Sequence, residues 1–589
     1  MTTRPSVPIA EVRLGEGADC VVLSSGSRPS DALVIRALAA AGMTELRRSA
    51  AGVVVGVQHL PLLLAASSVH LRWSDEARRW AENRVRVGQR YDAVLADIRS
   101  VIHAGSSLAR TRLVDVPGLD VLDDHQWVNV AAMTSRDGFG LCVFDEQGAG
   151  KTVTTIFAFD VLHHRDEADF LLIVAPKSMV AEWPRDFDRF RGSLYDVRTL
   201  VGGPRERRAA LSGTPEVIVT NFESTVSMEA ELRALLGRRA DRAVLVVDES
   251  FYVKNCDTRR TRAIRRLREW CGRAYVLCGT PAPNSPHDVV EQHNLVDFGT
   301  AFRGTSIPED REEARPVIAD VLARRGLLVR SLKSQVLPDL PGKSFTRVLL
   351  PLAPRQRAVY DDLAAGLVKD LESSDDTQFR KELTSFLARR SALLQVCSNP
   401  GGVVEDWIET PAKLLAMDEL LADLVGRQHE KVVVWSYYTA AIDALVARYQ
   451  RYRPVRYDGT VGDVQLRRDA IERFQTDDST MLFVGNPAAA GAGITLHRAR
   501  FALYESFSNQ AAHYLQSLDR IHRRGQDRQV EYVVLLAEDT IEEVEYERLN
   551  AKEQRAQELL GDEVVPPVTR TAMLDELRRS SSLPGAGQA

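Results

Sequence analysis

The chain opens with a segment in which short apolar runs alternate with amphipathic helical patterns. The run DCVVLSS predicts a strand, SDALVIRALAAAG a helix, AGVVVGV a second strand and SDEARRWAENRV a second helix. This alternation predicts a small α/β unit over residues 1–115. No pattern in the unit indicates a chemistry, so we expect it to be an accessory domain.

Farther along, apolar runs and helical stretches alternate more regularly. Residues 116–300 contain GLCVFDE, FLLIVAP, EVIVTN, AVLVVDE and AYVLCGT, and residues 411–562 contain KVVVWSYY, TMLFVGN, RFALYES and VEYVVLLAE. Strands separated by helices in this order predict doubly wound parallel sheets. We therefore expect an α/β protein with two such lobes. Residues 301–410 are expected to form a linker with helical insertions, and 563–589 a partly disordered tail that includes SSSLPGAGQA.

Composition narrows the class of protein only a little. The chain has 589 residues, of which 44% are hydrophobic, and its net charge is −5, so overall charge does not predict a nucleic-acid coat, although a local basic groove remains open. The six cysteines form no C-x-x-C pair and the twelve histidines show no zinc spacing. We expect a cytoplasmic protein with no structural zinc, no disulfide and no membrane segment.

The stretch FDEQGAGKT, residues 144–152, has the form of a phosphate-binding loop. It follows a predicted strand, contains Gly148 and Gly150, and ends in Lys151 and Thr152 at the start of a predicted helix. The strict pattern G-x-x-x-x-G-K-[ST] would require glycine where Asp145 stands. The lysine is notable in itself, because the chain has only ten lysines among its 76 basic residues.

A second candidate, AVLVVDES, places two carboxylates at the end of an apolar strand. Ligands collect at the carboxyl ends of strands in open α/β sheets. Asp248 can hold magnesium, and Glu249 can orient and deprotonate an attacking water. An ordinary polar loop would explain this motif taken alone, but its order and strand context beside the glycine loop weaken that explanation.

Seven separated motifs give the chain a family resemblance over residues 120–555. In order, they are FDEQGAGKT, VAPKSMVAEW, VVDESFYVKN, LCGTPAPNS, LLVRSLKSQVLPDLPGKS, VVVWSYY and QSLDRIHRRGQ. This series resembles the Swi/Snf-like branch of the superfamily-two helicase-related ATPases, which are DEAD/DEAH-box helicase-like. The first motif of that branch reads D-E-x-G-x-G-K-T, so Asp145 matches the form of the family.

The resemblance implies two RecA-like lobes that bind ATP and Mg²⁺ between them. By resemblance, Arg520 and Arg523 are arginine fingers with Gln516 beside them, Thr152 and Asp248 hold the metal, and Gly279, Thr280 and Pro281 couple hydrolysis to lobe movement. The remaining nucleotide-binding residues that it implies are Gln126, Asp145, Gly148, Gly150, Lys151, Gly491 and Gly493. A charged helix is the alternative for Arg520, Arg523 and Arg524, which the eight-residue frame around them disfavours, and a solvated helix position remains open for Gln126.

Contacts to DNA are also implied by the resemblance. The linker motif, matched at Arg330, Leu332, Lys333, Leu340, Pro341 and Lys343, is peculiar to this branch and implies movement on double-stranded DNA rather than strand separation. A motor that steps along DNA must contact mainly the phosphate backbone, and the candidate contacts are Lys177, Thr220, Ser436 and Thr495. The basic segment TRRTRAIRRLR, residues 258–268, is equally compatible with a DNA-binding face and with a solvated helix.

One departure bears on mechanism. The family has D-E-A-H or D-E-G-H, whereas Ser250 and Phe251 follow the carboxylates here, and the missing histidine normally relays between hydrolysis and DNA engagement. In the fifth motif, AAAGAGITL, Ile494 and Thr495 stand where leucine and asparagine are frequent, which we expect to be tolerated. The leading hypothesis is a prokaryotic or phage ATPase that moves on double-stranded DNA and displaces or remodels a DNA-bound protein. A strand-separating DNA or RNA helicase and a non-hydrolysing ATP- or DNA-binding scaffold are the alternatives.

Overall fold

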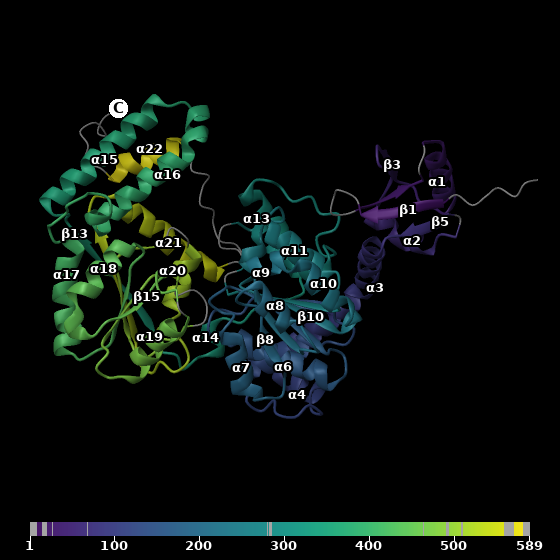
Figure 1. Cartoon of the computed structure of the whole chain (residues 1–589), viewed down its shortest axis with the longest axis horizontal. Coiled ribbons are helices and arrows are strands. Elements are labelled where there is room, and N and C mark those ends of the chain that lie inside the picture. The colour runs from purple at the N-terminus through teal and green to yellow at the C-terminus, as the bar shows by residue number, and fades with distance from the viewer. Residues whose placement is uncertain are drawn as a thin grey trace, which may run out of the picture.

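Three bodies follow one another along the chain in the computed structural model (Figure 1). They are the N-terminal domain (9–73), lobe 1 (75–329) and lobe 2 (343–580). The structure describes residues 9–14, 20–25, 28–67, 69–279, 281, 285–462, 464–489, 494–507, 511–558 and 570–580. Thr280, Gly491, Gly493 and the tail residues 581–589 lie outside these ranges. No helix among the described residues is both long and apolar enough to span a bilayer.

The N-terminal domain is a five-stranded sheet with one buried face. Its strands run in the order β3-β4-β2-β1-β5, with only the β1–β5 pair parallel. Alternate residues such as Val12, Leu23 and Val53 fill one core, as period-two patterning requires. The elements are β1 (Ile9–Leu14), β2 (Cys20–Ser24), α1 (Arg28–Ala40), β3 (Leu46–Ser49), β4 (Gly52–Gly56), α2 (Leu60–Ala65) and β5 (His70–Trp73).

A long helix, α3 (Asp75–Ala104), joins this domain to lobe 1 (Figure 1). Ser74 caps its start, accepting a hydrogen bond from the backbone N–H of Ala77 at 3.2 Å. Its first turns, through Ala81, pack in the core of the N-terminal domain and Val85 packs against that core, whereas the residues from Val87 onward pack in the core of lobe 1. The helix therefore belongs to both bodies.

Lobe 1 is built on a seven-stranded parallel sheet in the order β12-β6-β11-β10-β7-β9-β8. Its central strands are buried on both faces and read as unbroken apolar runs, as parallel sheets covered by helices do. The strands are β6 (Gly140–Val143), β7 (Phe170–Ala175), β8 (Val197–Thr199), β9 (Val217–Asn221), β10 (Ala243–Asp248), β11 (Arg273–Leu277) and β12 (Leu328–Val329). The helices after α3 are α4 (Ser106–Arg112), α5 (Asp124–Met133), α6 (Lys151–His164), α7 (Glu182–Arg191), α8 (Pro204–Ala210), α9 (Phe222–Ser227), α10 (Glu229–Gly237), α11 (Arg259–Arg268), α12 (His287–Asp297) and α13 (Arg311–Arg325).

Lobe 2 has a six-stranded parallel sheet in the order β13-β18-β17-β14-β16-β15, and the short helix α14 (Lys333–Val336) lies between the lobes (Figure 1). The strands are β13 (Lys343–Leu350), β14 (Val432–Trp435), β15 (Val455–Tyr457), β16 (Leu482–Gly485), β17 (Phe501–Tyr504) and β18 (Val530–Ala537). The helices are α15 (Pro354–Ser373), α16 (Asp376–Ser398), α17 (Ala412–Leu421), α18 (Thr439–Arg448), α19 (Val464–Thr476), α20 (Ala511–Leu518), α21 (Ile541–Glu558) and α22 (Arg570–Ser580).

The predicted architecture of two parallel-sheet lobes and a small N-terminal α/β region is confirmed. All nine apolar runs in the two lobes form strands. Two further strands, β12 and β13, fall inside the range expected to hold a linker and helices. β12 pairs with β6 of lobe 1 and β13 with β18 of lobe 2, so the actual crossing between the lobes is the short segment 330–342.

Helices α15, α16 and α22 form a separate layer on lobe 2 (Figure 1). The buried guanidinium of Arg390 in α16 joins two neighbouring helices, because it pairs with Glu545 of α21 at 2.6 Å and with Glu576 of α22 at 2.5 Å. Helix α22 thus falls within the range expected to be a tail and is fixed to the rest of the lobe.

Candidate active site between the lobes

The phosphate-loop motif forms the turn from β6 into α6. Gly148 and Gly150 have φ values of +88° and +87°, a backbone region that favours glycine. Space is short as well, since a Cβ on Gly150 would lie 2.4 Å from the side-chain nitrogen of Gln126. Lys151 begins α6 and is only 8% exposed; its Nζ donates to the backbone carbonyls of Asp145 at 2.8 Å and Glu146 at 3.3 Å. The loop therefore closes around its own lysine.

Two of the predicted nucleotide-binding side chains, Asp145 and Gln126, make hydrogen bonds to other parts of lobe 1 and to the linker. The buried carboxylate of Asp145 accepts hydrogen bonds from Asn129 Nδ2 at 2.6 Å and from the backbone N–H of Ser331 at 2.7 Å. It ties the loop to α5 and to the interlobe linker rather than facing a nucleotide. Gln126 accepts from the backbone N–H of Asp123 at 2.9 Å and donates to the Gly150 carbonyl at 3.4 Å, so it supports the loop from behind.

The two predicted hydrolytic carboxylates lie at the end of β10, next to the loop. Asp248 accepts from the indole N–H of Trp183 at 3.1 Å, and burial together with the charge of Glu249 raises the pKa of Asp248 to about 7. Glu249 adopts a left-handed backbone, φ +49°, and its Oε1 accepts from Gln147 Nε2 at 2.7 Å. Its other oxygen, Oε2, is buried with no hydrogen-bond partner in the described part of the chain. Thr152, half-buried in the first turn of α6, lies beside the lysine in sequence.

The predicted arginine fingers follow α20 of lobe 2 and lie next to this site, and the Nη1 of each donates to the Ile494 carbonyl of their own lobe. Arg520 is 3% exposed, and its Nε and Nη2 have no partner among the described residues. Burial, together with the like charge of Arg523, lowers the pKa of Arg520 to about 10, and the charges of Asp519 and of Glu249 across the interface oppose that lowering. The side chain of Arg523 approaches the loop, since its Cβ lies 3.7 Å from the position of a Cβ on Gly148. Gln516, one turn before Arg520, is buried in α20.

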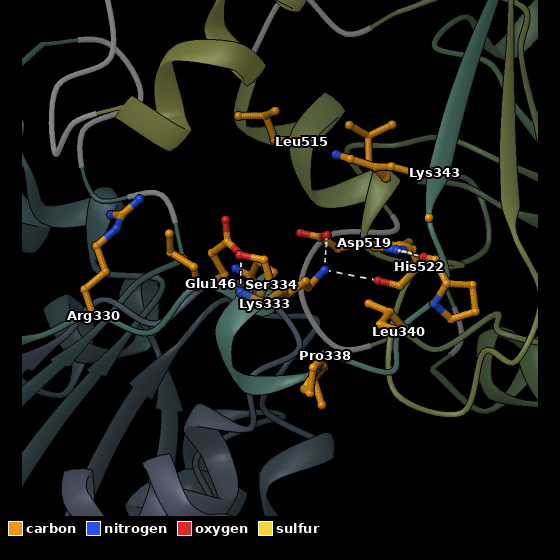
Figure 2. A pocket seen from close by; sticks show the side chains of 17 residues that line it. Glu146, Arg330, Lys333, Ser334, Pro338, Leu340, Lys343, Leu515, Asp519 and His522 are labelled. Atoms are coloured by element: carbon orange, nitrogen blue, oxygen red, sulfur yellow. Dashed lines mark hydrogen bonds and ion pairs between the residues drawn. The ribbon is translucent and has the colours of Figure 1, made fainter. Parts of the chain in front are cut away.

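The linker holds the two halves of the site against each other (Figure 2). The backbone N–H of Lys333 donates to the Glu146 carboxylate of the loop at 2.5 Å, while its ammonium pairs with Asp519 and donates to the His522 carbonyl at 3.1 Å. These contacts border a cavity of about 470 Å³ that also includes Arg330, Leu340 and Lys343. Beyond the cavity, Arg524 pairs with Asp123 of lobe 1 at 2.6 Å.

The four predicted DNA contacts are not equally accessible. Lys177 is exposed after β7 and Thr495 is half-buried. Thr220 and Ser436 are fully buried at the ends of β9 and β14, and the Ser436 hydroxyl donates to Glu505 at 2.8 Å. Both side chains are enclosed by the sheets, so in this conformation they do not present a hydroxyl to DNA.

The basic segment 258–268 becomes helix α11, and much of its charge is neutralised within lobe 1. Arg265 pairs with Glu291 at 2.5 Å and Arg266 with Glu229 at 2.5 Å, while Arg268 is buried and donates to backbone carbonyls. These contacts favour a structural role for this helix over a DNA-binding face.

Four supporting residues were missed by sequence reasoning. Each donates a hydrogen bond to a predicted site residue that is between 16 and 186 positions away in the chain. The four residues are Asn129, Gln147, Trp183 and Ser331. Trp183, Gln147 and Ser331 lie inside recognised motifs, which was the one available signal. Within the described residues, no group of three or more His, Cys, Asp or Glu side chains is placed to hold a metal ion by itself.

Comparison with known proteins agrees with this geometry. Residues 124–402 match the SNF2-related domain, and residues 412–525 match the helicase conserved C-terminal domain. A probable chromatin-remodeling complex ATPase chain from Oryza sativa subsp. japonica is 30% identical over 71% of this chain and 39% of that protein. The human SWI/SNF-related matrix-associated actin-dependent regulator of chromatin subfamily A member 1 is 27% identical over 71% of this chain and 41% of that protein. The chain thus spans about two-fifths of the length of these relatives.

A solved structure, the Sulfolobus solfataricus SWI2/SNF2 ATPase core in complex with dsDNA, shares 20% identity with a TM-score of 0.36, covering 79% of this chain and 97% of that chain. The first domain match includes Lys151, Asp248 and Glu249, and the second includes Arg520 and Arg523. The chain therefore contains an SNF2-related ATPase domain followed by a helicase conserved C-terminal domain.

Proposed function

We propose that this protein is an ATP-hydrolysing motor that moves along double-stranded DNA and displaces or remodels a DNA-bound protein. One observation supports it above all. The lysine loop of lobe 1 lies against Arg523 of lobe 2, and Arg520, three residues earlier, has buried Nε and Nη2 nitrogens with no partner among the described residues. Buried donors without acceptors are costly, and phosphate oxygens are the acceptors that such a guanidinium fits.

The loop and the carboxylates fit the expected substrate and metal. Lys151 now occupies carbonyls of its own loop, contacts that phosphate oxygens can replace. The buried Asp248 carboxylate and the Thr152 hydroxyl would hold Mg²⁺, which usually takes one or two protein ligands beside substrate phosphates. When bound, Mg²⁺ would neutralise charge that develops on the phosphates.

The protein residues divide the remaining work between the lobes. Glu249 has one oxygen fixed by Gln147 and one with no partner among the described residues, so it can orient an attacking water and accept its proton. Arg520 and Arg523 supply positive charge from the opposite lobe. Because both lobes must be in place for this charge to act, hydrolysis depends on lobe position, which is how a chemical step can drive movement along DNA.

Phosphate release measured with and without duplex DNA tests the proposal. We expect duplex DNA to stimulate turnover, and Lys151→Ala and Arg520→Ala each to lower kcat by about 10³-fold, the scale of a lost phosphate-stabilising cation. Lys431→Ala is a matched control, because Lys431 is also buried and donates to backbone carbonyls, but at the far side of lobe 2. A second assay follows displacement of a protein from duplex DNA.

Two results would contradict the proposal. One is turnover that is indifferent to duplex DNA and unchanged in Lys151→Ala. The other is ATP-driven separation of a forked substrate without protein displacement on intact duplex, which would favour a strand-separating helicase.

A further inference from the structure

The position of the missing histidine is filled by a side chain that cannot relay a proton or accept a hydrogen bond. Phe251 is half-buried, and its ring stacks on Tyr252 with centroids 4.6 Å apart. The contacts of the carboxylate segment with Gly279 and Pro281 therefore run through other residues.

The preceding residue makes such a contact. The buried Ser250 hydroxyl, next to Glu249, donates to Oε1 of Gln292 at 2.6 Å. Gln292 lies in α12 and is fully buried, and its Nε2 donates to the Pro281 carbonyl at 2.5 Å and to the Asp288 carbonyl at 2.7 Å. Both polar atoms of this amide are therefore hydrogen-bonded. The amide thus links Ser250 to Pro281.

A second side chain, that of Gln147, contacts Gly279, two residues before Pro281. Gln147 of the phosphate loop holds Glu249 and also packs against Gly279, where an added Cβ would lie 2.7 Å from its Cγ. Ion pairing between Lys254 and Asp288 at 3.0 Å fixes the start of α12 to the segment that follows Phe251. Side chains thus join the carboxylate segment both to Gly279, through Gln147, and to Pro281, through Gln292.

We propose that Gln292, acting with Ser250, is the positioning residue that couples the Asp248–Glu249 carboxylates to Pro281, in place of the absent histidine. The inference rests on the proposed DNA-driven ATPase. A displacement of the Pro281 carbonyl has to break its hydrogen bond from Gln292 or move the Gln292 amide, and a moved amide shifts the Oε1 that accepts from Ser250, the neighbour of Glu249. An apolar interior makes such a break costly.

The experiment measures kcat with and without duplex DNA and compares the ratio of the two. Gln292→Leu removes both ends of the link, and we expect it to lower the stimulation ratio at least about fivefold, the scale of a lost coupling energy between sites. Ser250→Ala removes only the hydroxyl and remains informative if the leucine variant folds poorly. We expect it to lower the ratio in the same direction, and Ser250→Thr, which keeps a hydroxyl, to retain most of it.

A buried glutamine elsewhere provides the matched control. Gln356 in α15 is also fully buried, donates to the Val396 carbonyl at 2.7 Å and accepts from the Ala412 backbone N–H at 3.1 Å. Gln356→Leu should lower the unfolding midpoint but leave the stimulation ratio intact. Wild-type ratios in folded Gln292→Leu and Ser250→Ala would overturn the inference, whereas wild-type protein with no DNA stimulation would instead overturn the proposed function.

Discussion

Two buried glutamates of lobe 1, Glu249 and Glu291, have one carboxylate oxygen with a hydrogen-bond partner and one with none among the described residues. Glu291 of α12 is an example outside the active site, because its Oε2 accepts from Arg265 while Oε1 is buried with no partner among the described residues. Burial raises the pKa of Glu291 to about 7, and Arg265 opposes the shift. Between the unfolded value near 4.5 and about 7, the folded state binds the extra proton, so this group lowers stability as pH rises through that window.

Glu291→Gln should therefore stabilise the protein more at pH 8 than at pH 5. We expect the difference in unfolding midpoint between variant and wild type to be larger at pH 8 by about 2–4 °C. Differential scanning calorimetry at the two pH values measures it. Glu538→Gln, at an exposed position, controls for the general loss of a negative charge. Equal differences at both pH values would show that Glu291 stays ionised in the fold without cost.

Sequence reasoning found the residues of the site more reliably than their partners. Lys151 was predicted from the glycine loop after one apolar strand, and Asp248 and Glu249 from the end of another. The charge of Lys151 acts on the pKa of the Asp248 carboxyl, so the two motifs lie close together. The partner of Asp145 was not predictable, because Ser331 is 186 positions away and contributes only a backbone N–H. Ser436 likewise gave no signal of burial, since its partner Glu505 comes from a neighbouring strand's end.

At the scale of elements, the short linker 330–342 makes hydrogen bonds to both lobes. Long apolar strands were predicted because burial on both faces leaves an unbroken run, whereas β12 has two residues and β13 has an exposed face, which gave weak signals. These two weak strands fix both ends of the crossing. Lys333 then bridges the phosphate loop and the arginine segment in between.

Removing the Lys333 ammonium should weaken the connection between the two halves of the site. Lys333→Met keeps the apolar stem, and we expect it to lower DNA-stimulated kcat about tenfold because the arginine segment loses its tether to the loop. Asp519→Asn removes the other partner, so the double variant should cost clearly less than the sum of the two single variants. Steady-state phosphate release of all four proteins gives this cycle.

Lys343→Met is the control for that cycle, since Lys343 lines the same cavity and its ammonium lies over Phe345 at 5.4 Å. Strict additivity of the Lys333 and Asp519 variants would contradict a tether. Equal losses in Lys333→Met and Lys343→Met would assign the effect to the charge of the cavity instead.

At the scale of the whole molecule, the chain divides differently from the predicted boundary near residue 115. Sequence patterns located the N-terminal sheet because its apolar runs alternate with helices. They did not separate α3 from that sheet, since an amphipathic helix has the same pattern whichever core it serves. In the structure, Trp80 packs with the N-terminal domain, while Tyr91 and Ile98 pack in lobe 1. Arg84 marks the change, stacked on Trp80 and paired with Glu269 at 2.8 Å.

Two truncations test this division. A chain that begins at Glu82 removes the N-terminal sheet and keeps the part of α3 that lobe 1 buries, so it should stay soluble and retain DNA-free ATP turnover within about threefold. A chain that begins at Val116 removes all of α3 and exposes its apolar contact surface on lobe 1, at about 25 cal/mol per Å² of apolar area, and it should aggregate or unfold at a much lower midpoint. Soluble yield, calorimetry and phosphate release measure both. If the chain from Glu82 lost turnover as completely as Lys151→Ala while remaining folded, the N-terminal domain would be part of the motor itself, and the two cores that meet along α3 would have to act as one unit.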